Sequence, residues 1–173
     1  MNIPLYQVDT FTSVVFKGNP AAVCVLDKWL SEGLMQEIAA ENNLSETAFV
    51  VKKDNLYELK WFTPLSEVDL CGHATLAAAF ILFRFYDTEA SRIEFETKSG
   101  AIFVEKSGPL LSLFFPERRG EAAFTVEGLP RALGNAEPEK ILLARDYLVI
   151  YSDEAIVRSL TPQMDLLKKV PVM

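Results

Sequence analysis

Residues 74–83, with the sequence ATLAAAFILF, form the longest apolar run of the chain, and Thr75 is its only polar residue. A helix with one buried face repeats apolar residues at positions i, i+3 and i+4 and keeps polar residues on the other face. This run has no polar face, so it predicts a helix from about residue 73 to residue 86 that is buried on every side. It is too short to cross a bilayer, which takes about 20 apolar residues.

Short strands are predicted on both sides of this helix, because alternating or continuous apolar runs end at turn residues. Ser31 is the expected N-cap of an earlier helix of about ten residues, with Leu34, Ile38 and Met35 facing the core. The polar turn at residues 52–55 predicts that the strands on either side of it form a hairpin. The predicted strands cover residues 3–11, 21–26, 45–51, 56–62, 92–97, 101–106 and 110–115.

Pro116 ends this series, and the segment PERRGEAA after it is typical of a linker. Beyond it the pattern predicts a short helix at 126–133, strands at 141–143 and 147–151, and a helix from about Asp153. The order of strand, acidic turn and helix in residues 21–41 returns in residues 145–167. A weak duplication explains this similarity, and so does the frequency of such units in α+β proteins.

Composition excludes several classes of protein. The chain has 173 residues, a net charge of −7 and scattered basic residues, so we expect no nucleic-acid partner, because phosphate binding needs clustered Lys and Arg. No signal peptide or membrane span is predicted, and we expect no membrane partner. Two cysteines far apart in such a chain are expected to be reduced thiols, so we expect a cytoplasmic protein.

The segment EVDLCGH, residues 67–73, places the only histidine at the predicted start of the apolar helix. The first amides of a helix have no partner inside it, and the aligned peptide dipoles add about half a positive charge there. A buried helix start must satisfy these donors, and the carboxylate of a substrate can do so, with Gly72 leaving room for its approach. Alternatively, Asp69 or the Thr75 hydroxyl caps this end.

His73, the only imidazole, fits a role as hydrogen-bond donor or proton carrier in an anion pocket, although a structural histidine at a helix start is equally compatible. Cys71 is a candidate nucleophile, since a helix start lowers the pKa of a thiol, or a small buried residue. The spacing of one His and two Cys predicts no metal site. No glycine-rich phosphate loop is present.

Glu46 stands in NNLSETAFVV, between polar residues and an apolar strand. Desolvation at the mouth of such a strand raises the pKa of a carboxylate toward the range that a general acid or base needs. A charged residue at the start of a strand is also often simply solvated.

Three long motifs occur together: FTSVVFKGNPAAVCVL, ENNLSETAFV and LKWFTPLSEVDLCGHATLAAAF. Their order and spacing over residues 1–116 resemble the phenazine-biosynthesis PhzF-like isomerase family. The resemblance implies an α+β, diaminopimelate epimerase-like fold, in which a curved, mostly antiparallel sheet wraps around a central apolar helix. We therefore expect a complete domain at residues 1–118, with the central helix at about 73–86, and an incomplete second domain at residues 119–173.

The same resemblance implies an acid/base proton shift on a small cyclic substrate that carries a carboxylate, without metal or organic cofactor. Glu46 corresponds to the family's proton-shuttling glutamate, and Gly72, His73 and Ala74 correspond to its substrate-binding segment. Cys71 does not match the thiol pattern of the two-base epimerases of this fold. No role is carried over to it.

The chain departs from the family in its second part. Family members are longer and carry a second-domain motif like DPVTGSAH, which residues 120–173 lack. We therefore expect an isomerase impaired by the missing site residues. The alternatives are a non-catalytic binding or scaffold protein, and a half-enzyme that is completed by a homodimer or by a separate C-terminal chain.

Overall fold

The computed structural model describes residues 2–123 and 126–171. The chain divides into two compact units, unit 1 at Met1–Pro116 and unit 2 at Glu117–Met173. The division lies two residues before the boundary predicted at residue 118.

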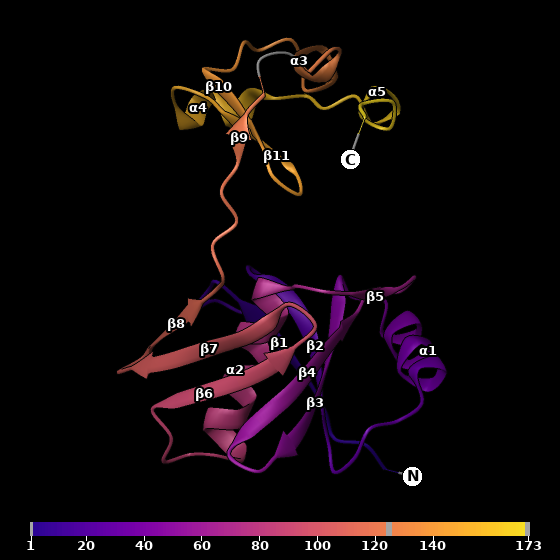
Figure 1. The fold of residues 1–173 in the computed structure, drawn as a ribbon, viewed down its shortest axis with the longest axis vertical. Coiled ribbons are helices and arrows are strands. Elements are labelled where there is room, and N and C mark those ends of the chain that lie inside the picture. The colour runs from indigo at the N-terminus through magenta and orange to yellow at the C-terminus, as the bar shows by residue number, and fades with distance from the viewer. Residues whose placement is uncertain (1, 124–125, 172–173) are drawn as a thin grey trace. The chain divides into compact units, whose positions relative to one another are not determined.

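Unit 1 is built on one eight-stranded sheet (Figure 1). The strand order is β1-β2-β3-β4-β6-β7-β8, with β5 paired to β4. The pairs β2–β3 and β4–β6 are parallel, and the other pairs are antiparallel. The strands are β1 (Leu5–Thr10), β2 (Asn19–Leu26), β3 (Glu46–Lys53), β4 (Leu56–Phe62), β5 (Glu67–Val68), β6 (Arg92–Thr97), β7 (Gly100–Ser107) and β8 (Leu110–Phe114).

Each parallel pair is joined by a helix, as parallel neighbours require. Helix α1 (Glu32–Asn42) connects β2 to β3, and helix α2 (Gly72–Phe85) lies in the connection from β4 to β6. The Ser31 hydroxyl accepts a hydrogen bond from the Leu34 amide, so the predicted N-cap of α1 is confirmed. Met35 is the fully buried residue of the three expected to face the core, and Leu34 and Ile38 are half-buried.

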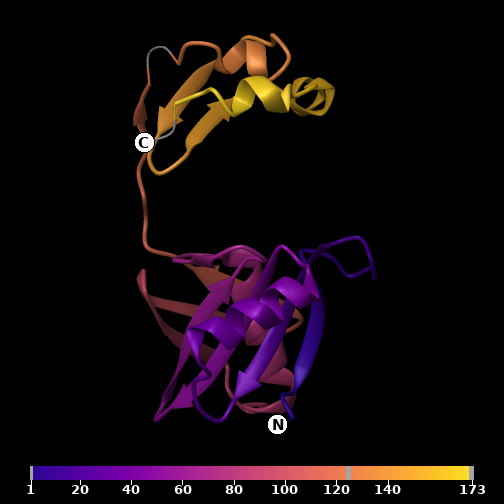
Figure 2. The same ribbon diagram turned by 90° about the vertical axis from the view of Figure 1, so that its right-hand side faces the viewer.

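The two helices cover opposite faces of the sheet, with α2 inside its curve and α1 outside (Figures 1 and 2). In β2, Ala21 and Val23 belong to the cluster around α2, whereas Cys24 and Leu26 belong to the cluster around α1. The same alternation continues in β3. The middle of each strand, residues 21–26 of β2 and 48–51 of β3, is apolar at every position because both faces are covered there.

Helix α2 confirms the predicted central helix, one residue earlier than expected at each end. Its alanines and Thr75 are fully buried, so the sheet approaches its backbone closely. Burial on every side is a wrong prediction, however, since Phe80 is 40% exposed and carries the Arg84 guanidinium above its ring. Helix α2 contacts both edge strands, β1 and β8, which do not pair, and this opening exposes one stripe of the helix.

No helix in the described residues has the length and hydropathy needed to cross a membrane.

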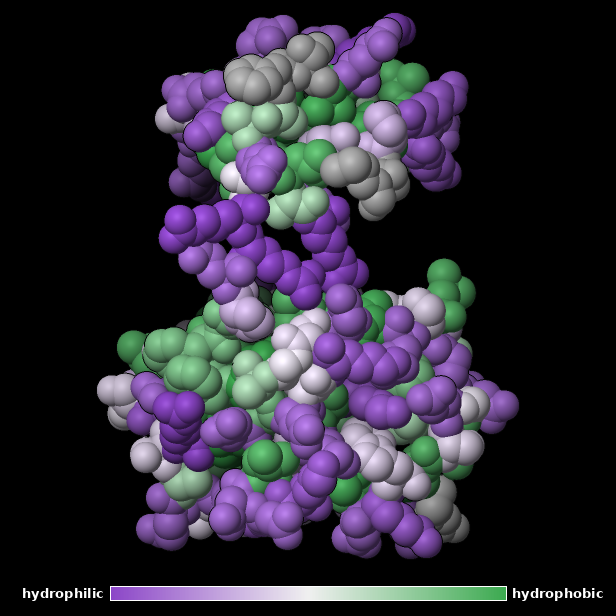
Figure 3. Space-filling model, viewed as in Figure 1, coloured by the Kyte–Doolittle hydropathy of each residue, from purple (hydrophilic) through white to green (hydrophobic). Residues whose placement is uncertain are grey.

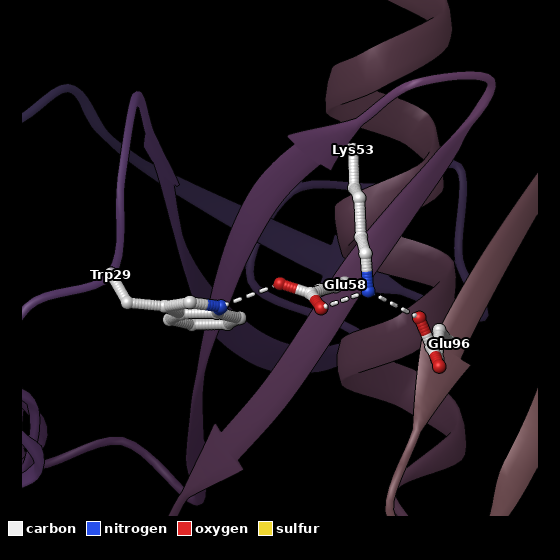
Figure 4. A network of polar contacts seen from close by, with 4 residues as sticks. All are labelled: Trp29, Lys53, Glu58 and Glu96. Atoms are coloured by element: carbon white, nitrogen blue, oxygen red, sulfur yellow. Dashed lines mark hydrogen bonds and ion pairs between the residues drawn. The ribbon is translucent and has the colours of Figure 1, made fainter.

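A polar network on the outer face joins three strands to the segment before α1 (Figure 4). The Glu58 carboxylate of β4 accepts from the Trp29 indole N–H at 2.7 Å and from the Lys53 ammonium at 2.8 Å. Lys53, at the end of β3, also donates to Glu96 of β6 at 3.1 Å. These bonds link β3, β4 and β6 to one another and to the segment before α1.

The outer face of β7 and β8 carries an apolar area on the lower unit of Figure 3. The rings of Phe103 and Phe114 stack there with centroids 4.5 Å apart. The Arg92 guanidinium lies 3.7 Å from the centre of the Phe103 ring, which covers part of this apolar surface with a charge.

Unit 2 has a three-stranded antiparallel sheet in the order β11-β10-β9 and three short helices. Among its described residues, only Val126, Leu129 and Ala132 are buried. The Gln163 amide donates to the Ala132 carbonyl at 2.8 Å, where α5 packs on α3. The elements are β9 (Glu121–Ala122), α3 (Leu129–Ala132), β10 (Lys140–Leu143), β11 (Tyr147–Ile150), α4 (Glu154–Ser159) and α5 (Met164–Leu167).

Candidate functional site

Glu46 is the first residue of β3, and strand alternation decides where its side chain points. Ala48 and Val50, two and four residues on, both pack in the α2 cluster. Residues at i, i+2 and i+4 of a strand share one face, so Glu46 points toward α2. The parallel pairing of β3 with β2 places it opposite Ala21.

Helix α2 begins next to Glu46, beside the start of β3. Cys71 is the N-cap residue, with extended backbone and no side-chain capping bond. Within the described residues no backbone carbonyl accepts from the amides of Gly72, His73 and Ala74, and the last two amides interact with the Cys71 sulfur. The Thr75 hydroxyl donates to the Cys71 carbonyl at 2.5 Å and therefore does not cap these amides.

Glu46 and His73 meet at this helix start. The Nε2 atom of His73 lies 3.2 Å from the Oε2 atom of Glu46, and the side chains are 10% and 19% exposed. Both atoms are buried, and neither makes a hydrogen bond of acceptable angle within the described residues. Buried polar atoms normally have a partner, so this pair is available to a bound molecule.

Cys71 completes the cluster. Its sulfur lies 3.4 Å from Nδ1 of His73 and also interacts with the Glu46 carboxylate. Burial raises the pKa of the thiol to about 12, and the nearby Glu46 carboxylate adds to this rise, while the His73 and Ala74 amides oppose it. The thiol is therefore protonated at neutral pH, which agrees with a small buried residue rather than a nucleophile.

Gly72 lies close to an aromatic ring at the helix start. A Cβ atom at this position would lie 3.0 Å from Cζ of Phe115, closer than real side chains allow without movement. The room that the sequence assigned to an approaching ligand is thus partly taken by an aromatic ring from the end of β8.

The spacing of residues along the chain did not predict that these three side chains bring metal-ligating atoms together. Glu46, Cys71 and His73 offer one carboxylate oxygen, one sulfur and one ring nitrogen, all within 4.8 Å of one another. Spacing along the chain could not predict this set, because Glu46 comes from β3 and the other two from the start of α2. The only available signal was the presence of both motifs in one chain.

A second polar group lies at the other end of α2. The Tyr57 hydroxyl donates to Asp87 at 2.9 Å, Lys52 pairs with the same carboxylate at 3.4 Å, and the hydroxyls of Tyr6 and Tyr86 are 3.0 Å apart. These groups bond to one another, so within the described part of the chain this end offers no comparable unpaired atoms.

Comparison with known proteins gives the family. A family model described as phenazine biosynthesis-like protein matches residues 8–128, which include the whole cluster. The chain belongs to the phenazine biosynthesis-like PhzF family. The resemblance stated from the three motifs is confirmed.

The relatives extend the match to the whole chain. An uncharacterized isomerase of Pseudomonas aeruginosa is 49% identical over 171 residues, covering 99% of this chain and 66% of the relative. A phenazine biosynthesis-like domain-containing protein of Homo sapiens is 40% identical over 157 residues, covering 84% of this chain and 54% of the relative. The chain thus spans about two thirds, or less, of the length of these PhzF relatives.

Solved structures confirm the predicted fold class. A PhzF-family protein of Enterococcus faecalis matches with a TM-score of 0.91 and 45% identity, over 99% of this chain and 66% of that one. A protein of Pseudomonas aeruginosa named as a predicted epimerase matches with a TM-score of 0.71 at 19% identity, which shows the shared fold alone. The α+β, epimerase-like architecture with a curved sheet is therefore correct.

Proposed function

We propose that unit 1 forms one wall of a PhzF-like isomerase site, where Glu46 moves a proton on a small cyclic substrate that carries a carboxylate. The observation that supports this most is the buried pair of Glu46 Oε2 and His73 Nε2, 3.2 Å apart and without another partner. The pair lies beside the start of α2, where the N-cap residue Cys71 makes no side-chain capping bond.

In this proposal one carboxylate does both steps of a proton shift. Glu46 takes a proton from one carbon and returns it two carbons away on the same face of the ring, so no second base is needed. The protonated Cys71 thiol can donate to Nδ1 of His73, which leaves the ring proton on Nε2, facing the reacting side. His73 then donates a hydrogen bond to Glu46 or to the substrate.

The helix start supplies the binding energy for the substrate's negative charge. Amides of Gly72, His73 and Ala74 point out of the end of α2, and the helix dipole adds a partial positive charge there. Binding the carboxylate of the substrate at the helix start holds the reacting carbon of the substrate in a fixed position relative to Glu46. No metal or organic cofactor enters the proposed reaction, as the family resemblance implies.

We further propose that the second wall comes from another polypeptide segment, either a complementing C-terminal chain or a second copy. Phe11 and Phe16 of the loop between β1 and β2 are 74% and 89% exposed, and Val14 and Val15 between them are also exposed. Exposed apolar clusters of this kind are typical of surfaces that bind another protein segment. Without that wall we expect turnover lower by several orders of magnitude.

We also propose that the protein works in the cytoplasm, with no nucleic-acid or membrane partner. Both cysteines are free and buried, which agrees with a reducing compartment.

The experiment compares two samples. One is the purified chain alone, and the other is the chain co-expressed with the C-terminal third of the uncharacterized isomerase of Pseudomonas aeruginosa that is 49% identical to it. Isomerisation of a dihydro-hydroxyanthranilate is followed by NMR, and native mass spectrometry reports whether the chain is a monomer, a homodimer or a complex. We expect activity in the complemented protein, little in the chain alone, and loss of at least about a thousandfold in Glu46→Gln.

Equal activity in Glu46→Gln and the unchanged protein would refute the catalytic assignment. Binding of the substrate without turnover in every assembly would instead favour the alternative of a non-catalytic binding protein.

A further inference from the structure

The cluster of Glu46, Cys71 and His73 contains a sulfur atom that takes no direct part in the proposed proton transfer. An acid/base site needs the carboxylate and a hydrogen-bond donor, whereas the sulfur adds a soft ligand for metal ions. All three ligand atoms lie within 4.8 Å of one another. We propose that these three side chains bind a thiophilic divalent cation, with Zn²⁺ as the best fit.

The distances agree with such an ion. Zinc binds sulfur at about 2.3 Å and imidazole nitrogen at about 2.0 Å, so two such ligands at a tetrahedral angle are about 3.5 Å apart. The Cys71 sulfur and Nδ1 of His73 are 3.4 Å apart. One oxygen of the Glu46 carboxylate, one nitrogen of the His73 ring and the Cys71 sulfur all lie within 4.8 Å of one another, so one ion can contact all three after small side-chain movements.

The burial of the three side chains supports the same conclusion. His73 is nine-tenths buried, and its Nε2 atom and Oε2 of Glu46 have no hydrogen bond within the described part of the chain. Cys71 is 8% exposed. The cluster is thus shielded from solvent and contains polar atoms without a partner, which a bound ion and its water ligand can satisfy.

The charges also balance. A thiolate and a carboxylate bring two negative charges, which a divalent cation neutralises after the thiol proton leaves to solvent. The partial positive charge at the start of α2 opposes a cation. With three protein ligands rather than four, we expect weaker binding than in a structural zinc site and an open position filled by water.

Binding of the ion has one consequence that rests on the proposed function. Glu46 cannot move a proton while it holds a metal ion, so the ion would act as a reversible inhibitor. The binding itself does not depend on any activity of the chain.

The test uses Co²⁺ as a spectroscopic probe, because a thiolate bound to cobalt gives a charge-transfer absorption in the near ultraviolet. Calorimetry with Zn²⁺ alone gives the stoichiometry and affinity. Cys71→Ser removes the sulfur ligand, and Cys24→Ala is the matched control, since Cys24 is a buried thiol in the α1 cluster. Circular dichroism checks that each variant is folded.

We expect one ion per chain, an absorption band in the unchanged protein and in Cys24→Ala, and no band in folded Cys71→Ser. Glu46→Gln and His73→Asn should bind at least about tenfold more weakly. A band that persists in Cys71→Ser, or the absence of Zn²⁺ binding to the folded chain, would overturn the proposal. Metal binding by an inactive chain leaves it intact, and activity without metal binding overturns the metal site alone.

Discussion

His73 and Glu46 meet with Nε2 and Oε2 3.2 Å apart, although neither atom gains a hydrogen bond of good geometry from the other. The two side chains come from the start of α2 and the start of β3. Two buried polar atoms that lie close together but lack hydrogen bonds can both bond to a third group placed beside them. In the two proposals this third group is the substrate or a divalent cation.

Gly72 should tolerate a side chain poorly. In Gly72→Ala the new Cβ atom would lie 3.0 Å from the Phe115 ring, so we expect destabilisation of about 1 kcal/mol and displacement of the helix start. Denaturant unfolding measures the change. Gly33→Ala in α1 is the control, because its Cβ meets nothing within 4 Å, and it should stabilise by up to about 1 kcal/mol.

The double variant of Gly72→Ala with Phe115→Ala tests the cause. The double variant should lose less free energy of unfolding than the two single variants lose together, by at least about 0.5 kcal/mol, because the clash is removed. Additive losses would show that Phe115 does not restrict this position.

Ala78 of α2 should not accept a larger side chain. It is fully buried among the strands, so Ala78→Leu overfills the core and should destabilise by about 1–3 kcal/mol. Ala40→Leu on the exposed side of α1 makes the same chemical change in a helix and should stay within about 0.5 kcal/mol. Similar thermal stabilities for the two variants would contradict the close packing around α2.

Glu58 should make stability depend on pH. Hydrogen bonds from Lys53 and Trp29 lower the pKa of its carboxyl below the ordinary value of 4.5. Because the pKa is lowered in the folded state, the ionised carboxylate of Glu58 stabilises the fold. This stabilisation is complete above about pH 4.5 and is lost as the pH falls through the pKa of the folded state. Glu58→Gln should therefore cost about 0.5–1 kcal/mol at pH 7 and progressively less in acid.

Urea unfolding of both proteins between pH 7 and pH 3 gives this difference directly. A difference that stays constant over that range would mean that the ionised form of Glu58 is not favoured by the fold.

Both thiols should react slowly in the folded protein. Burial raises the pKa of Cys24 and Cys71 to about 12 each. At pH 8 only about one thiol in ten thousand is then ionised, so a disulfide reagent should label the native chain slowly and the unfolded chain at once. The native rate should increase about tenfold per pH unit beyond pH 9, where a free cysteine already levels off. A native labelling rate that levels off near pH 9 would contradict these pKa values, and Cys24→Ala assigns the rate to Cys71.

Local features of unit 1 were predictable from the sequence because each depends on neighbouring residues. The Ser31 cap, the hairpin of β3 and β4 and the limits of α2 follow from hydrogen-bonding side chains, turn residues and apolar periodicity. The family followed from three motifs in register. The candidate residues Glu46, Gly72, His73 and Ala74 came from those motifs, and their roles stay predictions.

Only the tertiary structure decided how these pieces meet. The exposed stripe at Phe80 exists because β1 and β8 do not pair, and no pattern within α2 reveals whether a sheet closes around it. The contact of Glu46 with His73, and the metal-ligating set that they form with Cys71, depends on a strand and a helix start that are distant along the chain. Periodicity reports which face of an element is buried, whereas long-range packing determines which element covers that face.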